Sequence, residues 1–224
     1  MPRTRRIIPR EAALHIMSRG NNKQCIFRCN RDKYYYKSLL KELKEENNIS
    51  IFHYCIMDNH THLIVWLDGT GNLSRFMKQL NLSYFNYYKK TYGCCGHIWQ
   101  GRYKSSIIDT DSYLLQCGKY IELNPVRAGI VKYPNEYSFS SYCHYAFGLA
   151  DSIVSDNPVY LGFSESSKLR EKRYVEFVVD SEIMNSGYIS SQIFIGSDLF
   201  VKKLAEVYQI KNLARKKGRP RRTA

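Results

Sequence analysis

Two histidines one residue apart, and a tyrosine and an asparagine far downstream, are the side chains best suited to chemistry in this sequence. His60 and His62 lie in a strand-like stretch rich in branched and aromatic residues. Residues two apart in a strand point to one face, so both imidazoles can hold the same divalent metal. Tyr120 and Asn124 lie four apart in a predicted helix and therefore also share a face. A metal beside a phenol and an amide is suited to attack on a phosphodiester.

Each of these residues also has an ordinary explanation. Six histidines in 224 residues produce an H-x-H pair by chance with appreciable frequency. A helical tyrosine in a chain with 19 tyrosines usually packs in the core or lies on the surface. The four residues therefore gain their significance from the motifs around them.

Those motifs occur in a fixed order along the first two thirds of the chain. They are residues 15–21 (HIMSRGN), 57–65 (MDNHTHLIV), 97–105 (HIWQGRYKS), 113–115 (YLL) and 119–129 (KYIELNPVRAG). Together they resemble the single-tyrosine HUH transposases, the IS200-like transposases, and most closely the branch of REP-associated tyrosine transposases. The resemblance extends over about residues 1–150.

The resemblance implies a role for each of the four residues. Tyr120 is expected to be the nucleophile, which forms a 5′-phosphotyrosine and leaves a free 3′ hydroxyl. His60 and His62 are expected to bind a metal, with Asn124 in the position of a third ligand that is Gln in many relatives outside this branch. Imidazole and oxygen ligands suit Mg²⁺ or Mn²⁺, and Mn²⁺ is the better match for two nitrogens. Tyr113, near two helical turns before Tyr120, is a second candidate nucleophile.

The resemblance also implies a substrate, which is single-stranded DNA beside hairpins formed by palindromic repeats. The site needs a single strand because a duplex would hold the backbone away from the nucleophile. Basic side chains expected to contact this DNA are Arg3, Arg5 and Arg6 of the N-terminal motif, and Arg102 and Lys104 along the phosphate path. Arg127 either joins them or pairs with a carboxylate.

The charge of the chain favours a polyanionic partner. The net charge is +14 and the pI is near 9.4, which indicates nucleic acid first and an anionic membrane surface second. The sequence has no apolar run of the ~18 residues that a membrane helix needs, and no secretory signal. Its seven cysteines are therefore expected to be reduced thiols, and the protein to be cytoplasmic and nucleoid-associated in a bacterium.

The C-terminal tail adds a separate basic segment. Residues 211–224 hold seven Lys or Arg and no acid. Residues 216–222 (KKGRPRR) resemble an AT-hook, in which Arg219 would enter a narrow A·T minor groove. A basic tail that contacts phosphates without sequence preference explains the same residues equally well.

Two other functions compete with transposition. A non-catalytic, sequence-specific DNA-binding protein could keep the same scaffold and use its basic ends. A nuclease could activate water with the same metal instead of using Tyr120. A covalent protein–DNA adduct separates all three hypotheses.

The element order must bring the distant residues together. Strands are predicted at 11–19, 50–57, 61–67 and 103–109, and helices at 30–47, 73–92 and from Tyr113 to the residue before Pro125. This order predicts an α+β fold with a ferredoxin-like antiparallel sheet, the HUH endonuclease fold, and two helices on one face. The other face is then free to carry His60 and His62, where the third helix can cover them.

Three regions are predicted along the chain. Residues 1–150 form the catalytic domain, 151–210 a small helical region with helices near 168–180 and 198–208, and 211–224 the basic tail. The sequence leaves the choice between monomer and homodimer open.

Overall fold

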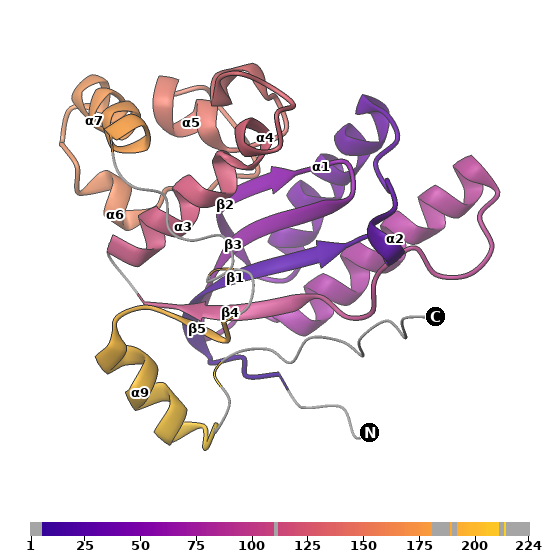
Figure 1. Ribbon diagram of the computed structural model, residues 1–224, viewed down its shortest axis with the longest axis horizontal. Helices are drawn as coiled ribbons and strands as arrows, with labels where there is room; N and C mark the ends of the chain where they lie inside the picture. Colours follow the sequence, from indigo (N-terminus) through magenta and orange to yellow (C-terminus); the bar gives the residue numbers. More distant parts are fainter. Residues whose placement is uncertain (1–5, 110–111, 181–188, 190–191, 211–212, 214–224) are drawn as a thin grey trace, which may run out of the picture.

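A five-stranded sheet with helices on both faces is the framework of the computed structural model (Figure 1). The structure describes residues 6–109, 112–180, 189, 192–210 and 213. Its strands are β1 (Glu11–Arg19), β2 (Ser50–Ile56), β3 (His60–Asp68), β4 (Lys104–Ile108) and β5 (Phe194–Ile195). Its α-helices are α1 (Asn30–Glu46), α2 (Leu73–Tyr92), α3 (Ser112–Glu122), α4 (Asn124–Arg127), α5 (Tyr142–Phe147), α6 (Pro158–Leu161), α7 (Ser167–Asp180) and α9 (Asp198–Val207).

The strand order confirms the predicted fold class. The order is β2-β3-β1-β4-β5, and the pairings among the first four strands are all antiparallel. Chain order β1-α1-β2-β3-α2-β4 with this spatial order is the ferredoxin-like arrangement. The predicted strand and helix bounds agree with the observed ones to within one or two residues through β4.

The fifth strand adds a parallel pairing to the predicted antiparallel sheet. Phe194 and Ile195 pair in parallel with Ile107 and Ile108 of β4. The region 151–210 therefore contributes a strand to the sheet as well as helices. A run of two residues is too short to show the alternation by which a strand is recognised in a sequence, so tertiary contacts with β4 must define it.

Helices α1 and α2 cover one face of the sheet. The α1 face that packs there buries Tyr36, Leu39, Leu40 and Leu43. The Tyr36 hydroxyl lies 3.4 Å from Thr61 Oγ1. Because successive strand residues point to opposite faces, Thr61 faces α1 while its two histidine neighbours face away from it.

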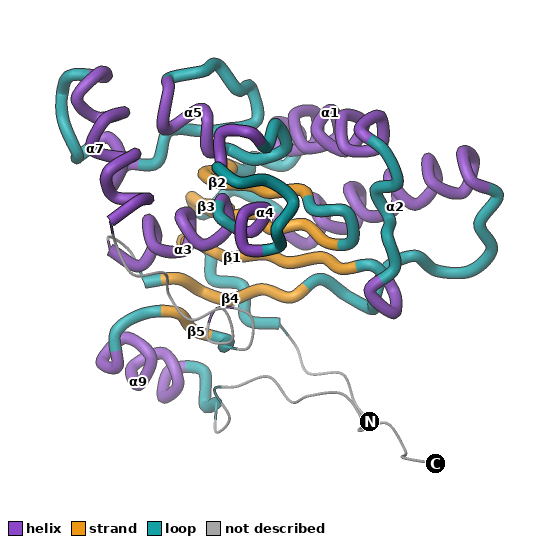
Figure 2. The backbone as a smooth tube through the Cα atoms, turned by 45° about the horizontal axis from the view of Figure 1, so that its top comes forward, coloured by secondary structure: helices purple, strands orange, loops and turns teal. Residues whose placement is uncertain are grey.

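Helix α3 lies on the other face, across β2 and β3, and α4 follows it (Figure 2). Its sheet side, with Leu114, Cys117 and Ile121, joins the main core. Its outer side joins a second apolar cluster, whose buried members are Leu115, Leu123, Tyr142, Tyr145, Ala146, Tyr160, Tyr174 and Val178. This cluster includes residues from both sides of position 150, and the domain boundary proposed there stays a prediction.

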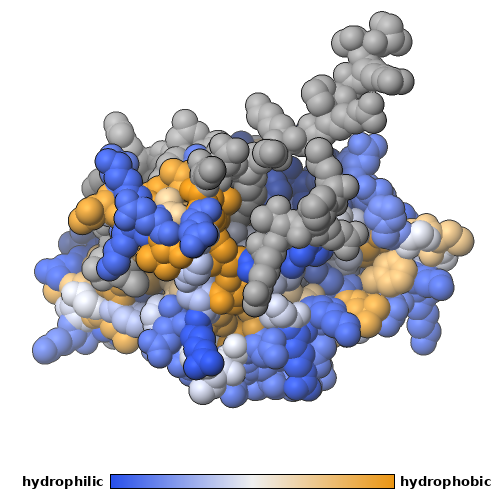
Figure 3. All heavy atoms as spheres, turned by 90° about the horizontal axis from the view of Figure 1, so that it is seen from below, coloured by the Kyte–Doolittle hydropathy of each residue, from blue (hydrophilic) through white to orange (hydrophobic). Residues whose placement is uncertain are grey.

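Helix α9 lies against β5 at the edge of the sheet. Its residues that pack against the main core are Phe200, Val201, Leu204 and Ala205, whereas Leu199 and Val207 remain exposed. Figure 3, seen from below Figure 1, shows hydrophobic residues gathered toward the side of α9 within a mainly hydrophilic surface. Across the described residues, no helix has the length and apolarity that crossing a membrane requires.

Candidate active site

The two histidines of β3 form a buried pair on the α3 face of the sheet. Their ring centroids are 4.9 Å apart, and the rings are nearly perpendicular at 85°. His62 is 2% exposed and His60 is partly buried. The pairing of β3 with β1 places His62 opposite Met17 and His60 opposite Arg19. The shared face predicted from the H-x-H spacing is therefore present in the structure.

A hydrogen bond at Nδ1 orients each of these imidazoles. Asn59 donates from Nδ2 to the Lys23 carbonyl, which turns its Oδ1 toward His60 Nδ1 at 2.5 Å. An amide oxygen only accepts, so Nδ1 of His60 carries the proton and Nε2 keeps its lone pair. Nδ1 of His62 lies 2.7 Å from Nε2 of His15, and the two rings stack with 13° between their planes. With His62 as the donor in that bond, its Nε2 also keeps a lone pair.

His15 contacts the histidine pair, and the sequence motifs had indicated no role for it. It belongs to the 15–21 motif, but no role was expected for its side chain. On β1 it lies opposite Ile64, and Ile64 shares a face with His62. The signal that could have found it is the antiparallel pairing of β1 with β3, since partners across that pairing share a face.

Burial keeps both histidines of the pair neutral. Burial, followed by the nearby charge of Arg19, lowers the pKa of His60 to about 4. Burial also lowers the pKa of His62 well below its usual value, with smaller contributions from His15 and His60. Neutral imidazole is the form that binds a metal, so the pair needs no proton release to do so. The described residues contain no group of three or more His, Cys, Asp or Glu that could hold a metal.

Tyr120, on α3, contacts His62 of this pair through its ring. Its ring centroid is 6.0 Å from that of His62, with the rings edge-on at 85°. The guanidinium carbon of Arg127 lies 4.9 Å from the centre of the Tyr120 ring. Tyr120 is only 5% exposed. Among the ring contacts between described residues, Tyr120 reaches His62 and Tyr113 does not, which favours Tyr120 of the two candidate nucleophiles.

The side chain of Asn124 forms its hydrogen bonds with the end of α3 and not with the histidines. Its Nδ2 donates to the carbonyls of Tyr120 at 2.9 Å and Ile121 at 3.1 Å. Helix α3 ends at Glu122, and Asn124 begins the short helix α4, so the single helix expected to run up to Pro125 is broken. The described hydrogen bonds of Asn124 include neither histidine. Its role as third ligand stays a prediction.

The predicted DNA contacts differ in their surroundings. Arg6 donates to the Tyr103 carbonyl at 2.9 and 3.2 Å, with its guanidinium 3.8 Å from the centre of the Tyr103 ring. Burial lowers the pKa of Arg6, although it stays a cation. Arg6, Arg10 and Arg102 line a groove of about 510 Å³ beside the start of α2. Arg3, Arg5 and Arg219 lie outside the described residues.

Lys104 lies in the same row of the sheet as His62. Met17 of β1 pairs with His62 on one side and with Lys104 of β4 on the other. Two strand spacings separate Lys104 from His62, roughly 10 Å, and all three side chains share a face. Lys104 is exposed, and its place on the phosphate path stays a prediction.

Comparison with known proteins decides the family. The family model described as "Transposase IS200 like" matches residues 10–124, slightly more than half of the chain. The chain belongs to the IS200-like transposase family. The matched residues include His60, His62, Tyr120 and Asn124. The family suggested by the sequence motifs is therefore confirmed.

One solved structure supports the fold of this IS200-like transposase. A REP-associated tyrosine transposase bound to a REP hairpin matches with a TM-score of 0.55 and 21% identity, covering 71% of this chain and 93% of that chain. A putative transposase from Deinococcus radiodurans R1 matches with a TM-score of 0.37 and 15% identity, covering 61% and 97%. None of the curated proteins matches this chain. The first structure supports the α+β fold that the strand order shows.

Proposed function

We propose that this protein cleaves and rejoins single-stranded DNA beside hairpins, with Tyr120 as the nucleophile and a 5′-phosphotyrosine as the intermediate. The observation that carries the proposal is the edge-on contact of the Tyr120 ring with His62. It brings a nucleophilic oxygen, on α3, to a pair of neutral imidazoles on β3. A solved relative that is bound to a REP hairpin supports the choice of substrate.

The reaction conserves the energy of the bond that it breaks. The phenol of Tyr120 loses its proton, its oxygen bonds to phosphorus, and the bond from phosphorus to the 3′ oxygen breaks. The 3′ oxygen takes up a proton and leaves as a hydroxyl. Because the phosphotyrosine is itself a phosphodiester, attack by a 3′ hydroxyl reverses the step and rejoins the strand without ATP. The guanidinium of Arg127, 4.9 Å from the centre of the Tyr120 ring, would place a positive charge near the scissile phosphate.

The donor set fits a divalent metal. His60 and His62 would ligate through their Nε2 atoms, since Nδ1 of each is in a hydrogen bond. The amide oxygen of Asn124 is the candidate third ligand, because the amide nitrogen is engaged by the end of α3. Mg²⁺ or Mn²⁺ suits this set, and when bound it would polarise the scissile phosphate.

Basic side chains would guide the DNA to this site. The net charge of +14 supplies affinity for phosphates. We place Lys104, Arg102 and Arg6 along the DNA strand, with the Arg6 guanidinium also donating to the Tyr103 carbonyl. Arg3, Arg5 and the tail with Arg219 would extend the basic surface. We place this activity in the bacterial cytoplasm, on nucleoid DNA.

One observation favours the competing DNA-binding function. Tyr120 is only 5% exposed, so little of its surface is open to a phosphate. A protein that binds DNA without cleaving it would need no access to this residue. The two functions differ in the fate of the DNA backbone.

The test is a covalent adduct on labelled hairpin DNA. Single-stranded DNA carrying a hairpin is labelled at its 5′ or 3′ end and incubated with the protein and Mn²⁺. A band that resists SDS and carries the 3′ label supports the proposal, because the protein holds the 5′ phosphate of the downstream fragment. Tyr120→Phe should abolish the adduct, and Tyr113→Phe, the matched control, should retain it. Cleavage without an adduct that persists in Tyr120→Phe would assign the nucleophile to water, and binding without cleavage would assign the competing function.

A further inference from the structure

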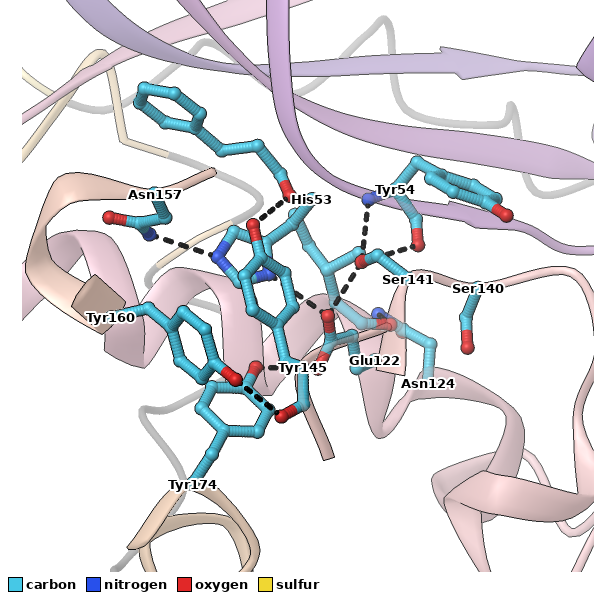
Figure 4. A network of polar contacts seen from close by, with 12 residues as sticks. His53, Tyr54, Glu122, Asn124, Ser140, Ser141, Tyr145, Asn157, Tyr160 and Tyr174 are labelled. Atoms are coloured by element: carbon cyan, nitrogen blue, oxygen red, sulfur yellow. Dashed lines mark hydrogen bonds and ion pairs between the residues drawn. The ribbon is translucent and has the colours of Figure 1, made fainter. Parts of the chain in front are cut away.

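A closed network of buried polar side chains connects the end of α3 to β2, to the start of α5 and to α7 (Figure 4). Its centre is the carboxylate of Glu122, two residues after Tyr120. His53 Nδ1 lies 2.9 Å from Glu122 Oε1, and both residues are fully buried. Ser141 donates to Oε1 and Tyr174 donates to Oε2, each at 2.6 Å. The three partners come from β2, from the residue before α5 and from α7, so one carboxylate connects three segments.

The hydrogen-bond partners of His53 determine which of its two ring nitrogens donates and which accepts. Asn157 Oδ1 accepts from the Val159 backbone, which turns the amide nitrogen toward His53 Nε2 at 3.1 Å. His53 Nε2 must then accept, so Nδ1 carries the proton and donates to Glu122. His53, Ser141 and Tyr174 then give Glu122 three hydrogen-bond donors, so its buried oxygens are satisfied. A network this closed is suited to holding a position rather than to exchanging protons with a substrate.

A β-bulge is what turns His53 toward α3. Ile51 pairs with Val65 and His53 pairs with Ile64, so Phe52 is an extra residue on β2. Partners across antiparallel strands share a face, and His53 therefore shares the face of Ile64 and of the metal-site histidines. Without the extra residue, alternation from Ile51 would point His53 toward α1 instead.

Helix α3 also approaches His53 unusually closely. A Cβ atom at Gly118 would lie 2.6–2.8 Å from three atoms of the His53 ring. Gly118 and Glu122 are one helical turn apart. The His53 imidazole therefore packs against the helix backbone at Gly118 and bonds to the side chain of Glu122 one turn later. Tyr120 lies between these two contacts along the chain, on the side that faces His62.

We propose that His53 and Glu122 are positioning residues for Tyr120. Their network fixes the depth and the rotation of α3 over the metal-site histidines. Tyr120 projects far from the helix axis, so a small rotation of α3 displaces its hydroxyl by about an ångström, which is enough to impair in-line attack. The network also makes residues 141–174 part of the catalytic apparatus rather than an accessory region. The proposal rests on the proposed function, because Tyr120 must be the nucleophile for its placement to govern a rate.

The primary variant is Glu122→Ala, with Asp32→Ala as the matched control. Asp32 is also a fully buried carboxylate, accepts from the hydroxyls of Tyr87 and Tyr92, and lies on α1, across the sheet from α3. At a temperature where both variants are folded, Glu122→Ala should slow single-turnover adduct formation about 10²-fold at saturating DNA and Mn²⁺. Its affinity for the DNA should be unchanged. Asp32→Ala should lose thermal stability similarly but keep its rate, and Glu122→Gln, which keeps the shape, should recover most of the activity.

A milder matched pair covers the case in which Glu122→Ala does not fold. Tyr174→Phe removes one donor to Glu122, whereas Tyr160→Phe removes a hydroxyl of the same cluster that donates to the Tyr145 carbonyl. Tyr174→Phe should slow adduct formation several-fold, by the loss of one buried hydrogen bond, and Tyr160→Phe should not. Equal rates in both members of each pair would overturn the proposal.

Hydrogen exchange separates this proposal from the proposed function. Amides of α3, measured without DNA or metal, should exchange faster in Glu122→Ala than in Asp32→Ala. Unchanged exchange in α3 would also overturn the proposal. Absence of any adduct in the wild-type protein would reject Tyr120 as the nucleophile, while the exchange result would still show whether Glu122 holds α3.

Discussion

The contact between Gly118 and His53 makes the substitution Gly118→Ala informative about how α3 is held. The new methyl would lie 2.6–2.8 Å from the His53 ring, whereas carbon atoms prefer about 3.5–4.0 Å. The ring cannot swing aside, because Glu122 holds its Nδ1 and Asn157 holds its Nε2. The helix must therefore move outward by about 1 Å.

Two opposing contributions determine the effect of Gly118→Ala on stability. Overpacking a buried site costs about 1–3 kcal/mol. Exchanging glycine for alanine within a helix gains up to about 1 kcal/mol. The clash is larger, so we expect a net loss of about 1 kcal/mol in the free energy of unfolding. The outward shift of Tyr120 should also slow adduct formation by about 10²-fold.

The assay is a double-mutant cycle with His53→Ala, read by urea unfolding and by single-turnover adduct formation. Removing the imidazole makes room for the methyl, so Gly118→Ala should become neutral or stabilising in that background. The change of sign is the signature of the contact. Stabilisation by Gly118→Ala in the wild-type background, or an equal effect in both, would refute the reasoning.

Three further predictions concern the metal site and the tail. His60→Ala or His62→Ala should abolish Mn²⁺ binding and cleavage but retain most DNA affinity, measured by calorimetry and filter binding, because affinity comes chiefly from the basic surface; full cleavage in the double variant would exclude this metal site. His15→Ala should weaken Mn²⁺ binding by roughly 10–100-fold through loss of the bond to His62, and an unchanged affinity in calorimetry would leave His15 without this role. Deleting residues 211–224 should flatten the plot of log affinity against log salt, and a larger loss on A·T-rich than on G·C-rich duplex flanks would distinguish an AT-hook at Arg219 from a tail that only contacts phosphates.

Local periodicity predicted most of the fold, because four strands and the first two long helices are each specified by their own residues. Alternation in β3 placed His60 and His62 on one face, and the observed sheet agrees. Helical spacing likewise predicted that α3 would present Tyr120. The order of these elements restricts the topology strongly, so the ferredoxin-like arrangement followed from the sequence.

The side chains that hold the site in place were not predictable in this way. His15 reaches His62 only through the pairing of β1 with β3, which a single strand does not reveal. His53 faces α3 because of the bulge at Phe52, and counting alternate residues from Ile51 assigns it to the wrong face. Glu122 looks like an ordinary polar residue at a helix end until Tyr174 is folded against it. Each of these depends on a contact between residues far apart in the chain.

Net charge likewise predicts that the protein binds DNA but does not show which basic residues contact it. Several cations in this strongly basic chain are engaged in structural contacts. Lys33 is paired with Asp58, Lys44 donates to the Ile153 carbonyl, and Lys119 donates to the Phe177 carbonyl. These ammonium groups stabilise the fold, and their loss would alter DNA binding only indirectly. Lys104 is a candidate DNA contact on different grounds, because it is exposed and lies in the row of His62. A count of positive charges therefore indicates the class of partner. The register of the β-sheet indicates where single-stranded DNA would pass over the protein.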